Sequence, residues 1–271
     1  MKKLLLSILF VSQTIVLCQE FSKEMFVSDK DSLPYRLLLP KNFDNDKKYP
    51  LIIFLHGVGE RGSDNELQLI HGKDLFINVN KDNNFPSIVV FPQCSKNSYW
   101  ANVSRVNNSF SFFADPRENK SLKLVEGMIY ELKSNFKINS NKIYVGGLSM
   151  GGMGTFELVY RNPNMFAAAF AICGGANPKI AEKISKTNWR IYHGDKDVVV
   201  PVELSVNMYK AIKSYSENVN LKIYPDVNHN SWDNVFEEPD LFQWLFSKSK
   251  NKLWNFYQYL NKLIYKVLLI I

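Results

Sequence analysis

The chain has 271 residues, of which 46% are hydrophobic and 22% are charged, and this ordinary globular composition excludes collagen-like, coiled-coil and disordered proteins. The formal net charge of +7 comes from the two ends, because Lys2 and Lys3 lie near the N-terminus and five lysines lie in the last 24 residues. Residues 19–247 therefore carry no net charge, which argues against a function in nucleic-acid binding.

Residues 1–18 are typical of a secretory signal peptide. Two lysines precede an apolar stretch from Leu4 to Leu17 that is too short to span a bilayer comfortably. Cleavage after Cys18 leaves a chain that begins at Gln19, and the protein is then secreted or periplasmic. A lipoprotein acylated on Cys18 is the less favoured alternative, because a small residue should precede such a cysteine and Leu17 is large.

Short apolar or β-branched runs alternate with helical patterns over residues 19–247. This alternation predicts an α/β fold with a mostly parallel central sheet and helices on both faces. No composition break or internal repeat interrupts it, so we expect a single domain over this range. The predicted strands are Tyr35–Leu39, Leu51–Leu55, Ile88–Phe91, Ile143–Gly147, Phe166–Ile172, Arg190–His193 and Leu221–Tyr224.

A crossover helix is predicted over residues 119–136, where apolar residues recur at intervals of three and four. We expect it to be core scaffold ahead of the next strand. The residues of its apolar face are Leu122, Val125, Ile129, Leu132 and Phe136.

The sequence GLSMG at residues 147–151 lies between a predicted strand and the helical run Met153–Arg161. A Gly-x-Ser-x-Gly motif between a strand and a helix predicts a nucleophile elbow, with Ser149 as the nucleophile. Such a turn is so sharp that the residues two before and two after the serine must lack bulk. A plain glycine-rich turn is the alternative interpretation.

A serine hydroxyl is hardly ionised at neutral pH, so it needs a histidine to take its proton and a carboxylate to orient that histidine. We look for them downstream of Ser149, first the acid and then the base. His229 is the candidate base, because His56 and His71 precede the serine and His193 lies at a strand end beside a glycine.

Asp197 is the candidate acid. It follows the predicted strand Arg190–His193, at the edge of the sheet where side chains of an active site gather. Asp195 is less favoured, because the residue just past a strand tends to be used in the turn. Asp197, two residues later, can direct its side chain toward a histidine.

Acyl transfer also needs hydrogen-bond donors for the oxyanion, and backbone N–H groups serve because they are preorganised. Met150 offers one at the start of a helix. Val58 offers the second, in the glycine-rich turn that follows the strand Leu51–Leu55. A loop without a ligand role is the alternative for residues 56–59.

No set of residues suggests a metal or a cofactor. The histidines are dispersed, the cysteines are not at ligand spacing, and there is no phosphate-binding loop, so we predict neither. Cys94 and Cys173 would be the remaining cysteines, and we favour two buried thiols over a disulfide.

Two tryptophans, Trp100 and Trp232, lie in segments expected to border the site and are candidates for contact with an aroyl or sugar group. Packing in the core or at the rim is the alternative role for each. Glu60 and Arg61 follow the oxyanion loop, and we favour a structural ion pair between them.

Residues 248–271 contain no acidic residue and have apolar residues at helical spacing, which predicts a basic amphipathic helix. Peripheral contact with a membrane and packing against the body or a partner are both compatible with this pattern.

These motifs resemble the α/β-hydrolase superfamily, and more closely the secreted phospholipase/carboxylesterase-like esterases, often labelled predicted peptidases, that are related to feruloyl and acetyl-xylan esterases. The resemblance covers residues 33–247 and depends most on GERGSDN at 59–65, GLSMGG at 147–152 and HNSW at 229–232. Asn228 departs from the pattern, because such proteins usually have glycine there, and we expect asparagine to be tolerated since it accepts left-handed backbone angles.

The resemblance implies Ser149 as nucleophile, Asp197 as acid, His229 as base, and the N–H groups of Val58 and Met150 as oxyanion hole. It implies a secreted serine esterase that hydrolyses carboxylic esters, including acetyl or feruloyl esters of plant polysaccharides, through an acyl-enzyme. A small molecule or a polysaccharide ester would be its substrate. The alternatives are a serine peptidase of the prolyl-oligopeptidase type and a non-catalytic surface-binding protein on the same scaffold.

Overall fold

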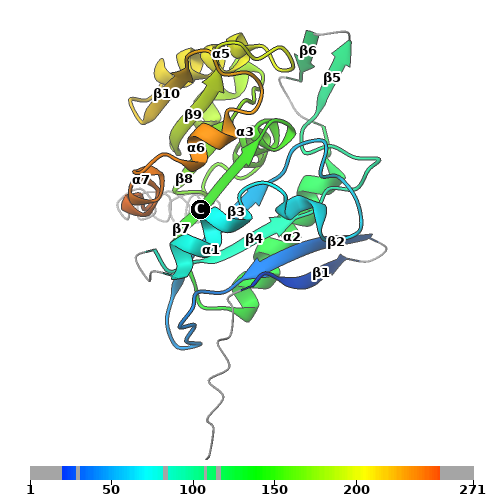
Figure 1. Ribbon diagram of the computed structural model, residues 1–271, viewed down its shortest axis with the longest axis vertical. Coiled ribbons are helices and arrows are strands. Elements are labelled where there is room, and N and C mark those ends of the chain that lie inside the picture. Colours follow the sequence, from blue (N-terminus) through cyan, green and yellow to red (C-terminus); the bar gives the residue numbers. More distant parts are fainter. Residues whose placement is uncertain (1–19, 29–30, 82–84, 107–108, 114–116, 251–271) are drawn as a thin grey trace, which may run out of the picture.

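The computed structural model describes residues 20–28, 31–81, 85–106, 109–113 and 117–250. Within them, eight strands form one central sheet and two form a small separate hairpin (Figure 1). The sheet strands are β1 (Ser22–Ser28), β2 (Asp31–Leu38), β3 (Tyr49–Leu55), β4 (Ile88–Pro92), β7 (Ile138–Leu148), β8 (Ala168–Ile172), β9 (Asn188–Gly194) and β10 (Val219–Tyr224). The hairpin consists of β5 (Val103–Val106) and β6 (Ser109–Phe112).

The sheet has the order β1-β2-β4-β3-β7-β8-β9-β10. All pairs from β4 to β10 are parallel, and only β1 and β2 run antiparallel to their neighbours. Each predicted strand lies in this sheet, so the predicted mostly parallel sheet is confirmed. The sequence pattern missed β1 and the hairpin, because their residues are mostly exposed and carry no apolar periodicity.

Helices cover both faces of the sheet, as predicted. The helices α2 (Lys120–Asn135), α3 (Met150–Arg161), α4 (Ala181–Ile184) and α5 (Val202–Lys213) contribute to the hydrophobic cluster on one face. The helices α1 (Lys73–Lys81), α6 (Trp232–Phe236) and α7 (Leu241–Ser247) contribute to the cluster on the other. Two short 3₁₀ helices, η1 (Leu67–Leu69) and η2 (Pro178–Ile180), lie in the connections.

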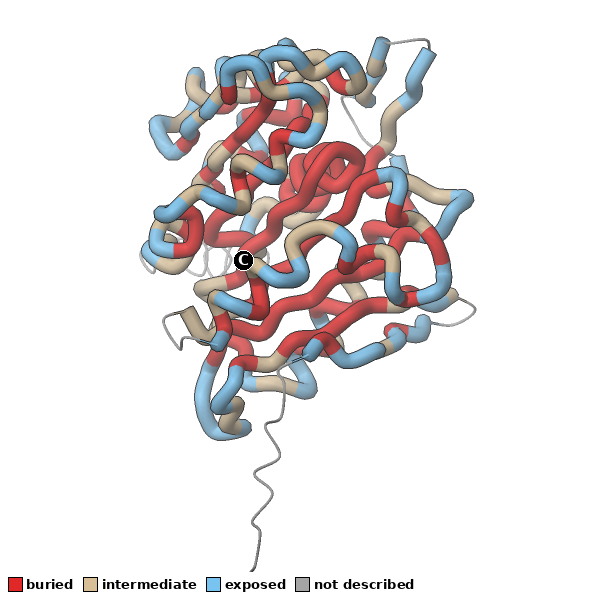
Figure 2. Tube along the Cα trace, viewed as in Figure 1, coloured by how far each residue is buried: buried red, intermediate tan, exposed pale blue. Residues whose placement is uncertain are grey.

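Strand β3 shows how the core is built. Successive side chains of a strand point to opposite faces, and Leu51, Ile53 and Leu55 accordingly join the first cluster while Ile52 and Phe54 join the second. All five are fully buried. The central strands are therefore buried along their length, whereas the β5–β6 hairpin is mostly exposed (Figure 2).

Helix α2 matches the predicted crossover helix to within one residue at each end. The Asn119 side chain caps its start by accepting the N–H of Leu122. Phe136 is the C-terminal cap rather than part of the helical face, and its ring meets Phe43 at 5.7 Å between centroids.

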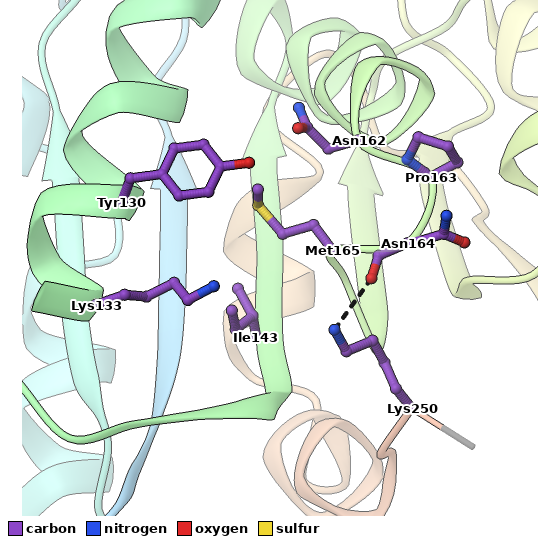
Figure 3. Close-up of a pocket in the computed structure, with 8 residues that line it drawn as sticks. All are labelled: Tyr130, Lys133, Ile143, Asn162, Pro163, Asn164, Met165 and Lys250. Atoms are coloured by element: carbon purple, nitrogen blue, oxygen red, sulfur yellow. Dashed lines mark hydrogen bonds between the residues drawn. The ribbon is translucent and has the colours of Figure 1, made fainter. Parts of the chain in front are cut away.

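A surface pocket of about 320 Å³ lies near the C-terminal ends of α2 and α3. Its lining comes from α2, from the first half of β7, from the loop before β8 and from Lys250, whose ammonium group donates to the carbonyl of Asn164 (Figure 3). None of the predicted site residues lines it, so it does not form part of the candidate site.

Several predictions about the chain ends lie outside the described residues: the signal peptide 1–18, the lipidation of Cys18 and the amphipathic helix beyond Lys250. No helix of the described part is long and apolar enough to cross a membrane. Cys94 and Cys173 are both free and buried, which confirms the preference for two thiols.

Candidate active site

The predicted site residues meet at one edge of the sheet. Ser149 follows β7, Asp197 follows β9 and His229 follows β10, and these strands lie in one parallel block. Since the carboxyl ends of parallel strands share an edge, three residues that are far apart in the sequence come together there.

Ser149 occupies the sharp turn between β7 and α3. Its backbone has a φ of 53° and a ψ of −116°, a strained conformation for a residue with a side chain. Its N–H donates to the carbonyl of Ile172 at 2.8 Å, which holds the turn against β8. A Cβ atom on Gly151 would lie 1.9 Å from the carbonyl oxygen of Leu55, so only glycine fits there. The close approach of α3 to β3 thus explains one glycine of the motif.

Two hydrogen bonds join the three side chains in a line. Ser149 Oγ lies 2.9 Å from His229 Nε2, and His229 Nδ1 lies 2.7 Å from Asp197 Oδ2. Because the carboxylate oxygen can only accept, Nδ1 carries the proton and Nε2 accepts from the serine hydroxyl. This arrangement positions the imidazole to take the proton of Ser149.

The Asp197 carboxylate is fully buried and surrounded by donors. Oδ1 accepts the N–H groups of Val199 at 2.8 Å and Val200 at 2.9 Å. Burial by itself would raise the pKa of Asp197, but hydrogen bonds from His193, His229 and the loop backbone hold that pKa well below its usual range. Asp197 is therefore an anion at neutral pH.

The neighbouring residues of both loops have structural contacts. Asp195 accepts the N–H of Asp226 at 2.7 Å and lies at the surface, away from His229. Asn228 accepts the N–H groups of Val198 and His229 through its side chain. The expected left-handed backbone is not at Asn228 but at Asp226, whose φ is 58°. The tolerance for asparagine at 228 therefore has a different cause, which is that its side chain joins the two loops.

Sequence reasoning missed His193, which was set aside because it ends a strand. Its Nε2 lies 3.1 Å from Asp197 Oδ2, so the acid contacts two histidines. A histidine placed four residues before the acid, at the end of the same strand, was the only signal available in the sequence.

The two predicted oxyanion donors flank Ser149. Met150 is the first residue of α3. Val58 lies in the loop after β3, the strand that pairs with β7. Neither N–H has an acceptor among the described residues. Arg61 donates to the carbonyl of Val58 at 3.1 Å and to that of Ser98 at 3.0 Å, which fixes the loop.

His56 stabilises the start of the loop that carries Val58. Its Nε2 accepts the N–H of Cys94 at 2.9 Å, so the proton is on Nδ1, which faces the carbonyl of Gly57 at 2.6 Å. The residue is 2% exposed, and burial lowers the pKa of His56 to about 4. The His56 ring is therefore neutral in the folded protein at neutral pH.

This burial predicts a loss of stability in mild acid. The unfolded chain binds the His56 proton near pH 6.5 and the folded chain only near pH 4, so the unfolded state binds more protons between these values. We expect His56 to contribute full stability above pH 6.5 and to lower the free energy of unfolding by about 3 kcal/mol as the pH falls to 4. Urea unfolding at a series of pH values measures this.

His56→Gln is the matched control, because an amide oxygen can still accept the N–H of Cys94 but does not titrate. The difference between the two proteins should depend on pH only in this window. Parallel pH dependences for the wild type and the variant would contradict the assignment.

The two tryptophans differ in position. The Trp232 ring is partly exposed and meets the ring of His229, the predicted base, edge-on at 5.5 Å between centroids. Trp100 is fully buried, packs against His56 and covers Gly154. The predicted substrate contact of Trp100 is therefore wrong for this structure, because a side chain in the core cannot reach a substrate.

The predicted ion pair between Glu60 and Arg61 is also wrong. Glu60 instead lies 3.7 Å from His71 Nε2, whose ring packs on Trp232 at 5.0 Å. Arg61 instead donates to the backbone carbonyls of Val58 and Ser98. Adjacent residues in a turn diverge, so closeness in sequence did not predict pairing.

One group of potential metal ligands occurs among the described residues, namely Cys173, Asp197 and His229, whose ligand atoms lie within 4.8 Å of one another. Asp197 and His229 are already hydrogen-bonded to each other. Burial raises the pKa of Cys173 far above its usual value, and metals bind the thiolate. The chemistry of these groups therefore fits a proton relay, formed by Ser149, His229 and Asp197, better than a metal site.

The sequence profile of the phospholipase/carboxylesterase family matches residues 43–242 of the chain. A bifunctional acetylxylan esterase/xylanase from Neocallimastix patriciarum is 26% identical over 131 residues, which are 48% of this chain and 19% of that protein. A thermostable esterase of known structure is 34% identical, with a TM-score of 0.77 over 85% of this chain and 63% of that one. The chain thus spans less than two thirds of these relatives.

A ferulic acid esterase from Anaeromyces mucronatus, solved in complex with ferulic acid, has a similar fold. It is 16% identical, with a TM-score of 0.59 over 83% of this chain and 89% of that one. At this identity the likeness concerns the fold alone.

Proposed function

The chain belongs to the phospholipase/carboxylesterase family, and from that premise we propose that it is a carboxylic ester hydrolase that uses Ser149, His229 and Asp197 as its catalytic residues. The observation that supports this most is the hydrogen-bonded line from Ser149 Oγ through His229 to Asp197, with distances of 2.9 and 2.7 Å. The distances lie in the range for proton transfer between a nucleophile and its base.

In the first half of the reaction, Ser149 Oγ attacks the ester carbonyl carbon while His229 Nε2 takes the hydroxyl proton. The carbonyl oxygen becomes an oxyanion and accepts the N–H groups of Val58 and Met150, which need no reorganisation. The buried Asp197 anion stabilises the imidazolium. When the tetrahedral intermediate collapses, the bond to the alcohol oxygen breaks and His229 returns the proton to the alcohol.

In the second half, water attacks the acyl-enzyme. His229 takes a proton from the water, a second tetrahedral intermediate forms and collapses, and Ser149 leaves with the proton that His229 returns. The acid is released and the enzyme is regenerated, so the relay needs no metal or cofactor to balance its protons.

The finer parts of the proposal concern substrate and location. One relative named above is an acetylxylan esterase/xylanase and another is a ferulic acid esterase, and we propose acetyl or feruloyl esters of plant polysaccharides as substrates. The partly exposed Trp232 beside His229 supports this, since an aromatic ring can stack on an aroyl or sugar group. Residues 1–18 support a secreted or periplasmic enzyme, and the basic residues 248–271 support peripheral contact with a membrane.

A panel of substrates tests this function. The purified protein is assayed against p-nitrophenyl acetate, methyl ferulate, acetylated xylan and a peptide p-nitroanilide, and is treated with a fluorophosphonate. We expect ester turnover, no amide cleavage, and one covalent adduct on Ser149 by peptide mass spectrometry. Cleavage of the anilide alone would indicate a peptidase, and folded protein with neither turnover nor adduct would overturn the enzyme hypothesis.

A further inference from the structure

His193 is the penultimate residue of β9, and its side chain is fully buried beside the proposed relay. Nε2 faces two oxygen atoms, Asp197 Oδ2 at 3.1 Å and the carbonyl oxygen of Val200 at 2.9 Å. Both oxygens are acceptors at neutral pH, so Nε2 carries a proton. This one N–H is therefore shared between the Val200 carbonyl and the carboxylate of Asp197.

The oxygen that His193 contacts is the one that His229 uses. Asp197 Oδ2 receives His229 Nδ1–H at 2.7 Å and His193 Nε2–H at 3.1 Å, while Oδ1 receives two backbone N–H groups. Four donors thus occupy both oxygens of the carboxylate, and they fix its plane. Without His193, Oδ2 would be held by His229 alone, which is itself the group to be oriented.

The other ring nitrogen connects His193 to the scaffold. Nδ1 lies 2.7 Å from the hydroxyl of Ser205, which is in α5 and is fully buried. That hydroxyl also lies 2.9 Å from the carbonyl oxygen of Gly174, in the loop after β8. Gly174 packs on Gly152, because a Cβ atom added to it would lie 2.6 Å from the backbone of Gly152. Through these contacts His193 connects Asp197 to Ser205 and Gly174, and Gly174 packs against the first turn of α3 at the nucleophile elbow.

We propose that His193 is a positioning residue of the ester hydrolysis proposed above: its Nε2–H holds the Asp197 carboxylate in the plane that orients His229 toward Ser149. The inference rests on that proposed function. His193 is not a catalytic residue, because a side chain with 0% exposure cannot touch the substrate. It acts on the rate through the acid, and the binding of substrate does not depend on it.

Two substitutions separate the donor from the rest of the side chain. In His193→Gln the terminal amide nitrogen can take the place of Nε2 and donate to Asp197. In His193→Asn the shorter side chain reaches only the Ser205 side, and the donor to Asp197 is lost. Both variants remove the ring, so the difference between them reports the hydrogen bond to the acid.

We expect His193→Asn to lower kcat for p-nitrophenyl acetate by roughly ten- to hundredfold with KM changed by less than about twofold, because one charge-assisted hydrogen bond is lost. His193→Gln should retain kcat within roughly threefold, because the bond is rebuilt. Circular dichroism and thermal unfolding of each variant establish that folded proteins are compared. Equal losses in both variants, or an unchanged kcat in His193→Asn, would overturn the proposal.

A spectroscopic readout does not need turnover. The His229 Nδ1 proton, bonded to a carboxylate, should resonate far downfield in the proton spectrum, and we expect it to move in His193→Asn and to keep its position in His193→Gln. In the wild type, ¹⁵N-labelled histidine should show a protonated Nε2 at His193. An unprotonated nitrogen there would exclude the donor role even if the variants did not fold. Should the wild type hydrolyse no ester, the proposed function fails, and these spectra still decide what His193 does.

Discussion

Replacing Ser149 with alanine should lower kcat for ester hydrolysis by a factor on the order of 10⁵ or more, the largest effect expected from any single substitution in this chain. Ser149 Oγ is the atom aligned with His229 Nε2, at 2.9 Å, and no acyl-enzyme can form without it. The remaining rate would come from water activated by His229 and from the oxyanion donors. Fold stability should change by about 1 kcal/mol or less, since one hydrogen bond is lost.

The measurement combines initial rates with fluorophosphonate labelling of the same samples. Ser104→Ala serves as the matched control, because that serine is exposed on β5 and belongs to the hairpin rather than the central sheet. It should keep full activity and full labelling. Labelling of the Ser149→Ala protein at another serine, with turnover preserved, would place the nucleophile elsewhere.

The geometry of the candidate site could be predicted from the sequence because each part is local or has a fixed order along the chain. The elbow needs small residues at two defined positions, and Gly151 meets the carbonyl oxygen of Leu55 in the way that this constraint requires. Asp197 and His229 could be placed because parallel strands bring their carboxyl ends to one edge. These inferences depend on backbone topology rather than on the packing of side chains.

Contacts that depend on packing could not be inferred in the same way. Trp100 lies in a segment that was expected to border the site, yet its ring is directed into the core, where it packs against His56. Glu60 and Arg61 are adjacent and of opposite charge, but the turn directs one toward His71 and the other toward backbone carbonyls. Alternation along a strand says which residues are buried, but it does not say which polar partner a buried residue will meet.

His193 is the clearest example of this limit. A strand-end histidine has one obvious structural role, and the sequence gives no reason to connect it with a carboxylate four residues later. The connection requires the loop from 194 to 200 to turn back on the strand, which the N–H groups of Val199 and Val200 achieve by bonding to Asp197. Asp197 thus stabilises the conformation of residues 194–200, and this conformation places its carboxylate beside His193 and His229.

Because of this arrangement, Asp197→Asn should lower kcat by a factor on the order of 10⁴. An amide presents one oxygen and one NH₂ group, whereas all four hydrogen bonds of Asp197 are donated to it. Whichever way the amide turns, its NH₂ group faces donors. If the NH₂ group faces His229, it favours the tautomer with the proton on Nε2, and that nitrogen cannot take the proton of Ser149. If the NH₂ group faces the loop, the N–H groups of Val199 and Val200 lose their acceptor.

Asp195→Asn separates this effect from the loss of a nearby negative charge. Both aspartates lie in the loop after β9, but Asp195 is exposed: it accepts the N–H of Asp226 and lies 3.9 Å from the exposed Lys196 ammonium group, so an amide oxygen can replace it. We expect this control to keep kcat within roughly threefold, since the relay is intact. The comparison is made with p-nitrophenyl acetate at neutral pH. A larger loss in Asp195→Asn than in Asp197→Asn would mean that the acid of the relay had been misassigned, whereas the expected order would show that the orientation of His229, and not the local charge, limits the reaction.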